Sequence, residues 1–370
     1  MKCNINAGDL ASALRSIRAR ARANKAEILN HVRVETFLDG RLTLLAHDGD
    51  SSSEAFLPAE VDVAGVCCIP ADPLMRLIAG TLGSATVSIE VDSLQVTIKV
   101  GRSRYKLPVL NAADFPPALS ANGGIKFSVT KDDIDQLLVR PAAALDPKDV
   151  RPIASGVFLH DEDGMLCGAG YSSACLMRFE TKIPSNGISG TIVPLDAISE
   201  ISAIGAGELT ISDRIIGIRT DRLSYSSKLI DARYPSAWVK FILPAEGSYV
   251  ECDRQALLEA LARLQVVSDF AKERLLDVLI SGDELSANVT GSADGIETME
   301  CDAVDADGKS FCLQVQNLIA SCKAARGDRI RIFIRGTTTD PIRIVDLFEP
   351  DAVNQQMPCK SKRSQEAIAA

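Results

Sequence analysis

The chain has 370 residues, of which 46% are hydrophobic, 24% charged and 5% aromatic, and its formal net charge is −9. This composition is typical of a globular protein with enough apolar mass for two to three domains. The acidic balance excludes a protein that coats nucleic acid with a wholly basic surface, although a local basic lining is compatible with it.

Targeting and membrane signals are missing from the sequence. No stretch approaches about 18 consecutive apolar residues, so we expect no membrane span. The chain begins Met1-Lys2-Cys3-Asn4, without the apolar run of a secretion signal. We therefore expect a cytoplasmic protein that does not bind membranes.

Three stretches of the sequence begin alike and recur at nearly constant spacing. Each has an apolar residue at the end of a predicted strand, then a helix-capping residue, then apolar residues four apart on one helical face. The capping residues are Asn6, Thr130 and Asp253. A second helix is predicted in each repeat, around Leu74, Ile198 and Leu318. A long internal repeat of this kind predicts a chain built from three similar modules.

Between the helices, apolar and polar residues alternate with a period of two. Residues 87–91, 94–100 and 330–334 show this pattern, which predicts antiparallel strands with one buried face. Asp-Gly pairs at 39–40, 163–164 and 307–308 favour hairpin turns. The sequence thus predicts an α+β fold with two helices packed on antiparallel sheet in each module. The predicted boundaries are 1–122, 123–244 and 245–358, followed by a polar C-terminal tail at 359–370.

Motifs for catalysis or metal binding are not found in the linear sequence. The ten cysteines and three histidines lack the spacing of zinc ligands, and most cysteines sit in apolar runs, which predicts buried thiols in a reducing cytosol. There is no nucleophile elbow, phosphate-binding loop or dinucleotide fingerprint. We therefore expect no enzyme activity, no metal and no cofactor.

Several strings resemble the bacterial sliding clamp, the β subunit of DNA polymerase III. They are residues 101–107 with 112–116, 149–151 with Gly156, 227–235 and 356–358. The resemblance covers residues 1 to about 360. It implies a processivity factor in which each chain forms half of a six-domain ring, closed by head-to-tail association of a homodimer around duplex DNA. Such a ring tethers polymerases, and its contacts to double-stranded DNA are independent of sequence.

Basic side chains on and beside the predicted helices are candidates for facing DNA. They are Arg15, Arg18, Arg22, Lys25, Arg140, Lys148, Arg254 and Lys323. By resemblance, Lys25 and Lys148 match positions where clamps touch the duplex. The alternative is that these residues are ordinary solvated helix faces. The helix predicted at 195–201 has no basic residue, so we expect it to repel phosphate locally.

The resemblance also implies a groove that binds short linear motifs of polymerase subunits and the clamp loader. The matching positions are Arg151, Ala154, Gly170, Ser172, Ser173, Cys175, Pro235, Phe241, Ile242, Met357 and Pro358. The run 170–175 differs from the family's usual Thr-Asp-Gly-His-Arg-Leu, and the segment after 235 is about two residues longer. We expect a groove of altered selectivity; plain inter-domain packing is the alternative.

For self-association, Tyr105 and Leu107 match an edge strand of the family's first domain, and Val266 and Val267 match a helix end in its third. The alternative is that the two valines belong to an internal core. A second hypothesis for the whole chain is a divergent clamp paralogue, of plasmid or phage type, that acts as a protein-binding scaffold. The sequence leaves open which polymerase or loader is served and what the tail does.

Overall fold

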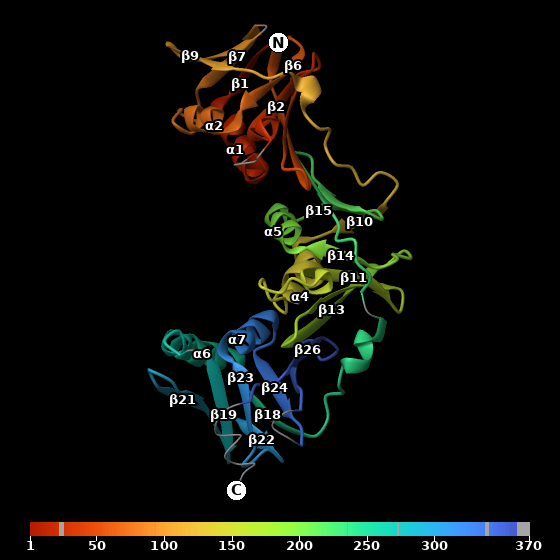
Figure 1. Ribbon diagram of the computed structural model, residues 1–370, viewed down its shortest axis with the longest axis vertical. Helices are drawn as coiled ribbons and strands as arrows, with labels where there is room; N and C mark the ends of the chain where they lie inside the picture. The colour runs from red at the N-terminus through yellow and green to blue at the C-terminus, as the bar shows by residue number, and fades with distance from the viewer. Residues whose placement is uncertain (22–25, 93, 235, 272–273, 337–339, 361–370) are drawn as a thin grey trace. The chain divides into compact units, whose positions relative to one another are not determined.

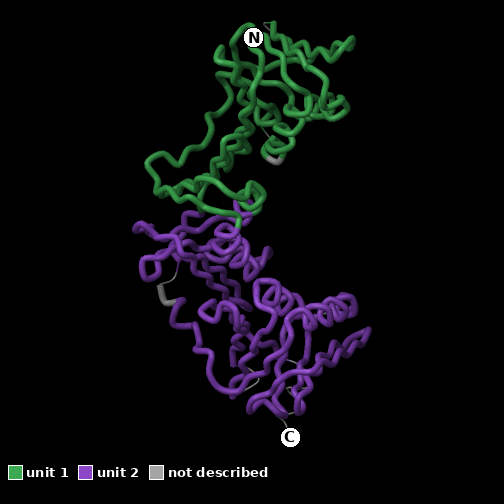
Figure 2. The backbone as a smooth tube through the Cα atoms, turned by 180° about the vertical axis from the view of Figure 1, so that it is seen from behind, with its two compact units in different colours: residues 1–131, 199–229 green, residues 132–198, 230–370 purple. Residues whose placement is uncertain are grey.

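The computed structural model describes residues 1–370 apart from 22–25, 93, 235, 272–273, 337–339 and 361–370 (Figure 1). The chain divides into two compact units, residues 1–131 with 199–229 and residues 132–198 with 230–370 (Figure 2). Each unit is therefore built from segments that are distant in the sequence. None of the helices in the described part of the chain has the length and apolarity needed to cross a bilayer.

The first unit contains two antiparallel sheets and the helices that pack on them. Its strands are β1 (Lys2–Asn6), β2 (His31–Thr36), β3 (Arg41–His47), β4 (Ser51–Pro58), β5 (Glu60–Val63), β6 (Gly65–Pro70), β7 (Thr86–Asp92), β8 (Gln95–Val100), β9 (Ser103–Pro108), β10 (Ile125–Val129), β15 (Gly207–Ile211), β16 (Ile215–Arg219) and β17 (Leu223–Lys228). One sheet has the order β5-β1-β7-β8-β9, and the other β10-β15-β16-β17-β4-β3-β2-β6. The pairing of β17 with β4 joins residues 223–227 to residues 51–55, so one sheet spans two of the predicted modules.

The second unit repeats this plan. Its strands are β11 (Gly156–Glu162), β12 (Met165–Tyr171), β13 (Cys175–Pro184), β14 (Thr191–Pro194), β18 (Ser248–Asp253), β19 (Leu275–Ser281), β20 (Glu284–Val289), β21 (Gly295–Glu300), β22 (Asp302–Val304), β23 (Ser310–Gln314), β24 (Arg329–Ile334), β25 (Ile342–Asp346) and β26 (Val353–Gln356). The sheet orders are β14-β11-β12-β13-β26-β25-β24-β18-β22 and β21-β20-β19-β23. Here the pairing of β13 with β26 again joins two predicted modules.

The helices begin where the capping pattern predicts. α1 (Ala7–Ile17) follows Asn6, whose side chain accepts a hydrogen bond from the backbone N of Asp9 at 3.1 Å. α6 (Arg254–Ser268) follows Asp253, which accepts from the N of Ala256 at 2.7 Å. The second helices, α2 (Ala71–Ala79), α5 (Leu195–Ile204) and α7 (Val315–Ala324), also lie at the predicted positions. The α+β fold class is confirmed, while the boundaries of the three modules and the tail stay a prediction.

Apolar side chains from the helices and both sheets form the core of each unit. In the first unit, Leu10, Leu14 and Ile17 of α1 pack with Leu74 and Ile78 of α2 and with the strands. In the second, the apolar faces of α6 and α7 pack on β18–β20, β24 and β25. Nine cysteines are buried, as the sequence predicts for thiols in apolar runs.

The helical segment at 131–142 differs from the regular helix that the sequence predicts. It consists of α3 (Lys131–Ile134), a π-helical turn η4 (Asp135–Val139) and α4 (Arg140–Ala142). Gly168 and Gly170 of β12 lie directly against this segment. A Cβ at Gly168 would overlap the carbonyl oxygen of Leu137, and a Cβ at Gly170 would overlap that of Pro141. Gly170, predicted to line a groove, is instead a packing residue that lets the helix approach the sheet.

Arg140 also differs from its predicted role. Its side chain is 8% exposed and pairs with Glu349 at 2.5 Å. The guanidinium further donates to the carbonyl of Ala324 at 2.7 Å and lies 4.0 Å from the ring centre of Phe179. Burial lowers the pKa of Arg140, and Glu349 opposes this shift. Arg140 therefore holds α4 against α7 and the end of β25, and it is not available to a DNA phosphate.

Replacing Arg140 should destabilise the second unit, because Glu349 would be left partly buried without its main partner. We expect Arg140→Met to lower the free energy of unfolding by about 3 kcal/mol. The exposed Lys148→Met is the control and should change stability by less than about 0.5 kcal/mol. Urea unfolding, followed by the fluorescence of Trp238 in the same unit, measures both. Equal stability of the two variants would contradict the packing role of Arg140.

Candidate functional site

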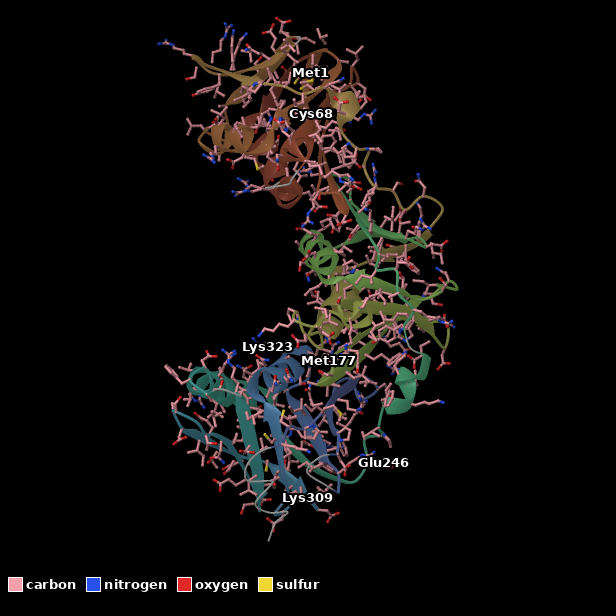
Figure 3. The ribbon with its side chains drawn as sticks, in the orientation of Figure 1. Met1, Cys68, Met177, Glu246, Lys309 and Lys323 are labelled. Atoms are coloured by element: carbon pink, nitrogen blue, oxygen red, sulfur yellow. The ribbon has the colours of Figure 1, made fainter. Side chains whose placement is uncertain are left out.

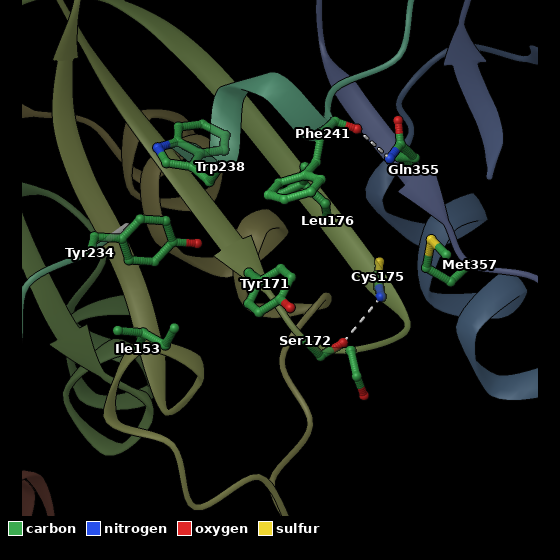
Figure 4. Close-up of a pocket in the computed structure, with 11 residues that line it drawn as sticks. Ile153, Tyr171, Ser172, Cys175, Leu176, Tyr234, Trp238, Phe241, Gln355 and Met357 are labelled. Carbon is green, nitrogen blue, oxygen red and sulfur yellow. Dashed lines mark hydrogen bonds between the residues drawn. The ribbon is translucent and has the colours of Figure 1, made fainter. Parts of the chain in front are cut away.

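An apolar cavity of about 280 Å³ opens in the second unit beside the junction of β13 and β26 (Figure 4). It is lined by Ile153, Tyr171, Ser172, Ser173, Cys175, Leu176, Tyr234, Trp238, Phe241, Gln355 and Met357. A concave apolar site with a few polar groups is the usual form of a binding pocket for a small ligand or a peptide anchor.

The aromatic wall of the cavity is held by ring stacking. Tyr234 stacks on Phe158, with ring centres 4.2 Å apart and the planes 3° from parallel. Trp238, in the short helix η6 (Ser236–Phe241), meets Tyr234 edge to face at 5.9 Å. Tyr234 and Trp238 are each 8% exposed, and burial raises the pKa of Tyr234. These rings therefore form a preformed wall rather than a mobile surface.

Hydrogen bonds fix the backbone beside two exposed residues at the rim of the cavity, Phe241 and Met357. The side chain of Gln355 donates to the carbonyl of Phe241 at 2.8 Å and accepts from the N of Leu243 at 2.9 Å. The backbone N of Met357 donates to the carbonyl of Ala174 at 2.8 Å. Even so, the Phe241 side chain is 69% exposed and that of Met357 43%. Large apolar side chains that are exposed on an anchored backbone indicate a surface that binds a partner.

A larger and more polar cavity of about 770 Å³ adjoins the apolar one and shares Phe241, Gln355 and Met357 with it. The charged residues that line this second cavity are Lys240, Glu246, Lys309, Arg335 and Asp340. Lys309 and Glu246 are labelled in Figure 3. The groove therefore runs from an apolar end to a charged end, so that it could take a peptide with apolar anchors and a polar flank.

Five of the residues predicted for the groove line the apolar cavity. They are Ser172, Ser173, Cys175, Phe241 and Met357. A short turn places the first three, because the N of Ser172 donates to the carbonyl of Cys175 at 2.8 Å and the N of Cys175 donates to Ser172 Oγ at 3.2 Å.

The other predicted groove residues lie elsewhere. Ala154 is fully buried, and Ile242 packs on the core behind the cavity. Arg151 hydrogen-bonds to Asp149 and lowers the pKa of that carboxyl to about 2. Among the described residues, neither Arg151 nor Pro358 lines the apolar cavity. Pro235 lies outside the described residues.

Sequence reasoning missed Ile153, Leu176, Tyr234, Trp238 and Gln355. Ile153 and Leu176 each lie next to a predicted position, Ala154 and Cys175. Trp238 is the single tryptophan of the chain and falls in the lengthened segment after residue 235. An aromatic residue in that insertion was the available signal for a wall of the groove.

Each unit by itself also carries exposed basic residues that are candidates for contact with DNA. Arg15 of α1 and Arg18 of the short helix η1 (Arg18–Arg20) are exposed and, with Arg76 of α2, line a cleft of about 180 Å³ between these elements. In the second unit, Lys148 and Lys323 are exposed, the latter on α7 (Figure 3). Arg22 and Lys25 lie outside the described residues.

Other cations are engaged within the chain. Arg254 donates to the carbonyls of Gly327 and Cys322 at 2.5 Å and 3.5 Å, and so satisfies acceptors at the C-terminal end of α7. Arg20 pairs with Asp48 at 2.8 Å and with Glu200 of α5 at 2.9 Å. The acidic charge of Glu200 on α5 is therefore neutralised by Arg20, which reduces the local repulsion of phosphate that the sequence predicts for this helix.

Exposed apolar side chains lie on the edge strands β9 and β21 and on α6. Tyr105 of the edge strand β9 is 41% exposed, and Leu107 beside it is half-buried. On α6, Val266 is 65% exposed, whereas Val267 packs partly against the core. β21 is an edge strand of the second unit and exposes Ile296 by 65%. Ile296, which the sequence did not single out, lies on the kind of edge that can pair with another strand.

Comparisons with known proteins agree with this architecture. Residues 1–120 match the family model described as the DNA polymerase III beta subunit, N-terminal domain. The Beta sliding clamp of Caulobacter vibrioides is 26% identical over 378 residues, which cover 97% of this chain and 100% of that protein. The Beta sliding clamp of Pseudomonas aeruginosa is 28% identical over 213 residues, and there the alignment spans 55% of this chain and 58% of the relative.

Solved structures show the same fold. The DNA polymerase III subunit beta from Pseudomonas aeruginosa superposes with a TM-score of 0.88 at 22% identity, covering 98% of this chain and 100% of that chain. The pol III beta of Caulobacter crescentus gives a TM-score of 0.87 at 23% identity with the same coverage. Together, the family model, the relatives and the fold confirm the resemblance of this chain to the bacterial DNA polymerase III beta subunits, the sliding-clamp family.

Proposed function

We propose that this chain is a DNA sliding clamp that acts in the cytoplasm without catalysing a reaction. Two copies close head to tail into a ring around duplex DNA, and the groove tethers polymerase subunits and the clamp loader through short linear motifs. The observation that carries this proposal is the alignment of 97% of the chain with the complete Beta sliding clamp of Caulobacter vibrioides. The alignment spans the whole length of that relative.

The charges of two edge strands, β9 and β21, support head-to-tail closure. The edge strand β9 contains Arg104 and Lys106 and no acidic residue, whereas β21 contains Glu297 and Glu300 and no basic residue. Glu297 already pairs with Arg263 at 2.7 Å. Pairing β9 of one copy with β21 of the next would bring Glu300 to the cations of β9 and would cover Tyr105 and Ile296. Pairing of like edges would bring like charges together. The charges therefore favour a heterologous contact, which closes into a ring when the rotation permits.

The exposed cations suit loose contact with phosphate. Arg15, Arg18, Lys148 and Lys323 are exposed, and none of them has an ion-pair partner within the described residues. Flexible cations that meet phosphate through screened or water-mediated contacts bind without sequence preference and release counterions. Such contacts allow the protein to slide.

The groove supports the tethering role. A peptide that inserted an apolar side chain between the Trp238 wall and the exposed Phe241 and Met357 would bury area that is now in contact with water. A few such anchors account for most of the affinity in linear-motif recognition. The adjoining charged cavity would then set the preference for residues flanking the anchors.

A second candidate function is a divergent clamp that acts mainly as a protein-binding scaffold. Arg20, Arg140 and Arg254 are engaged inside the chain, and α5 has no basic residue. Fewer free cations weaken the attraction to DNA, whereas the groove is unaffected. Topological retention on DNA separates the two functions.

For the ring, we expect DNA topology to decide whether the protein stays bound. The protein is incubated with linear duplex, the duplex is ligated into a circle, and gel filtration at about 0.3 M salt removes protein held only by phosphate contacts. The protein should stay with the circle and be lost when a restriction enzyme linearises it. Protein added after ligation is the control and should not be retained, because a closed ring cannot thread onto a circle.

Retention that is the same before and after linearisation would contradict encirclement. A failure to be retained on the circle, with the groove still binding a peptide, would favour the scaffold function.

For the groove, we expect Phe241→Ala to weaken binding of a fluorescent peptide from a bacterial replicative polymerase by at least about tenfold, as for a central apolar anchor. Phe348→Ala is a matched control, because Phe348 is 70% exposed, like Phe241 at 69%, but does not line the groove. Fluorescence anisotropy measures both affinities. Equal affinities in two folded variants would rule out this groove as the peptide site.

A further inference from the structure

Three side chains with metal-binding chemistry converge on the hairpin behind the groove. β11 and β12 are joined by the turn at Asp163-Gly164, and His160 and Cys167 are directly opposed across the two strands. Glu162 lies two residues from His160 and therefore on the same face. One ligand atom from each residue lies within 4.8 Å of the other two, and this is the one such group that the described residues contain.

The donor set matches zinc. An imidazole nitrogen, a thiolate sulfur and a carboxylate oxygen are the ligands that zinc prefers, at about 2.0–2.3 Å from the ion. Tetrahedral bond lengths of this size place the ligand atoms roughly 3.3–3.8 Å apart, so small side-chain rotations would close the observed spacing. Three protein ligands would leave the fourth position for water.

The imidazole supplies an independent indication. His160 is 9% exposed, and its Nδ1 is buried without a hydrogen-bond partner. Its Nε2 lies 3.3 Å from Oε2 of Glu162, a long contact for a hydrogen bond. A buried imidazole with one nitrogen facing a carboxylate and the other without a hydrogen-bond partner is suited to coordination.

The charges around the cluster are anionic on balance. The Cys167 thiol interacts electrostatically with three carboxylates, those of Glu162, Glu180 and Asp161. The positive charge of Arg178 opposes them. Arg178 pairs with Oε1 of Glu162, whereas Oε2 faces His160. Arg178 can therefore orient the carboxylate while the other oxygen reaches a metal. We propose that His160, Glu162 and Cys167 form a binding site for a zinc-like divalent cation.

Binding at this site exchanges a proton for the metal. The Cys167 thiol releases its proton to solvent as the sulfur–metal bond forms, and the ion gives up the waters that the three ligands replace. Because the proton is a product, binding strengthens as the pH rises. The site does not depend on DNA or on a partner, so it stands apart from the clamp function.

Metal binding at this site would also restrict the aromatic wall of the groove. The His160 ring stacks on Phe158 at 4.9 Å and meets the edge of Trp238 at 5.3 Å. Coordination fixes the ring orientation of His160, and with it the packing of Trp238, which lines the groove. Because Trp238 is the single tryptophan of the chain, its fluorescence reports the state of the site directly.

Cobalt titration of the metal-free full-length protein tests the site. One equivalent of Co²⁺ should produce a thiolate-to-cobalt charge-transfer band in the near ultraviolet and a parallel change in Trp238 fluorescence, and Zn²⁺ should abolish the band. Cys167→Ser should lose the band, and His160→Gln should weaken Co²⁺ binding at least about tenfold. Cys301→Ser is the control for a buried thiol outside the cluster and should behave like the native protein.

Two outcomes would overturn the proposal. The first is a native protein, folded by circular dichroism, that shows no charge-transfer band with micromolar Co²⁺. The second is a band that survives in Cys167→Ser or disappears in Cys301→Ser. If Cys167→Ser does not fold, His160→Gln decides, and unchanged affinity in that variant would equally contradict the site.

Discussion

Backbone pairing between strands that are distant in the sequence is the interaction on which this structure depends. β17 pairs with β4 in the first unit, and β13 pairs with β26 in the second. Each pairing covers strand edges whose N–H and C=O groups would otherwise be unsatisfied. Each also makes one continuous sheet from segments that belong to different predicted modules.

The groove is a consequence of the second pairing. β26 contains three adjacent buried polar residues, Asn354, Gln355 and Gln356. Their amides bond to Ser321, to the backbone at Phe241 and Leu243, and to Cys175, so the strand is held from both sides. The chain then emerges at Met357 beside the aromatic wall. Without this polar strand, the rim of the cavity would lack one of its two exposed anchors.

The sequence predicted the features that depend on local periodicity. The helices around Leu10, Leu74 and Leu257, and the alternating strands, follow from side-chain spacing and capping residues alone. The groove was predicted by alignment with a known family at positions such as Ser172, Phe241 and Met357, of which the first two lie in stretches that differ from the family's usual pattern.

The remaining features depend on contacts that spacing does not encode. The run Val353–Gln356 has the composition of a surface segment, and only the amide network explains its burial. Arg140 has the charge of a solvent-facing residue, but Glu349 and Phe179, far along the chain, enclose it. His160, Glu162 and Cys167 do not fit a linear zinc motif, because a hairpin rather than a short loop brings them together.

Head-to-tail pairing of the edge strands β9 and β21 is the central claim, and cross-linking tests it most directly. Tyr105→Cys and Ile296→Cys place thiols on β9 and β21, and a short bis-maleimide joins thiols that lie close in the assembled protein. The double variant should give a covalent dimer of about 79 kDa, twice the 39.5 kDa of one chain, while neither single variant cross-links. Cross-linking of either single variant to itself, or a double variant that stays monomeric, would contradict the account.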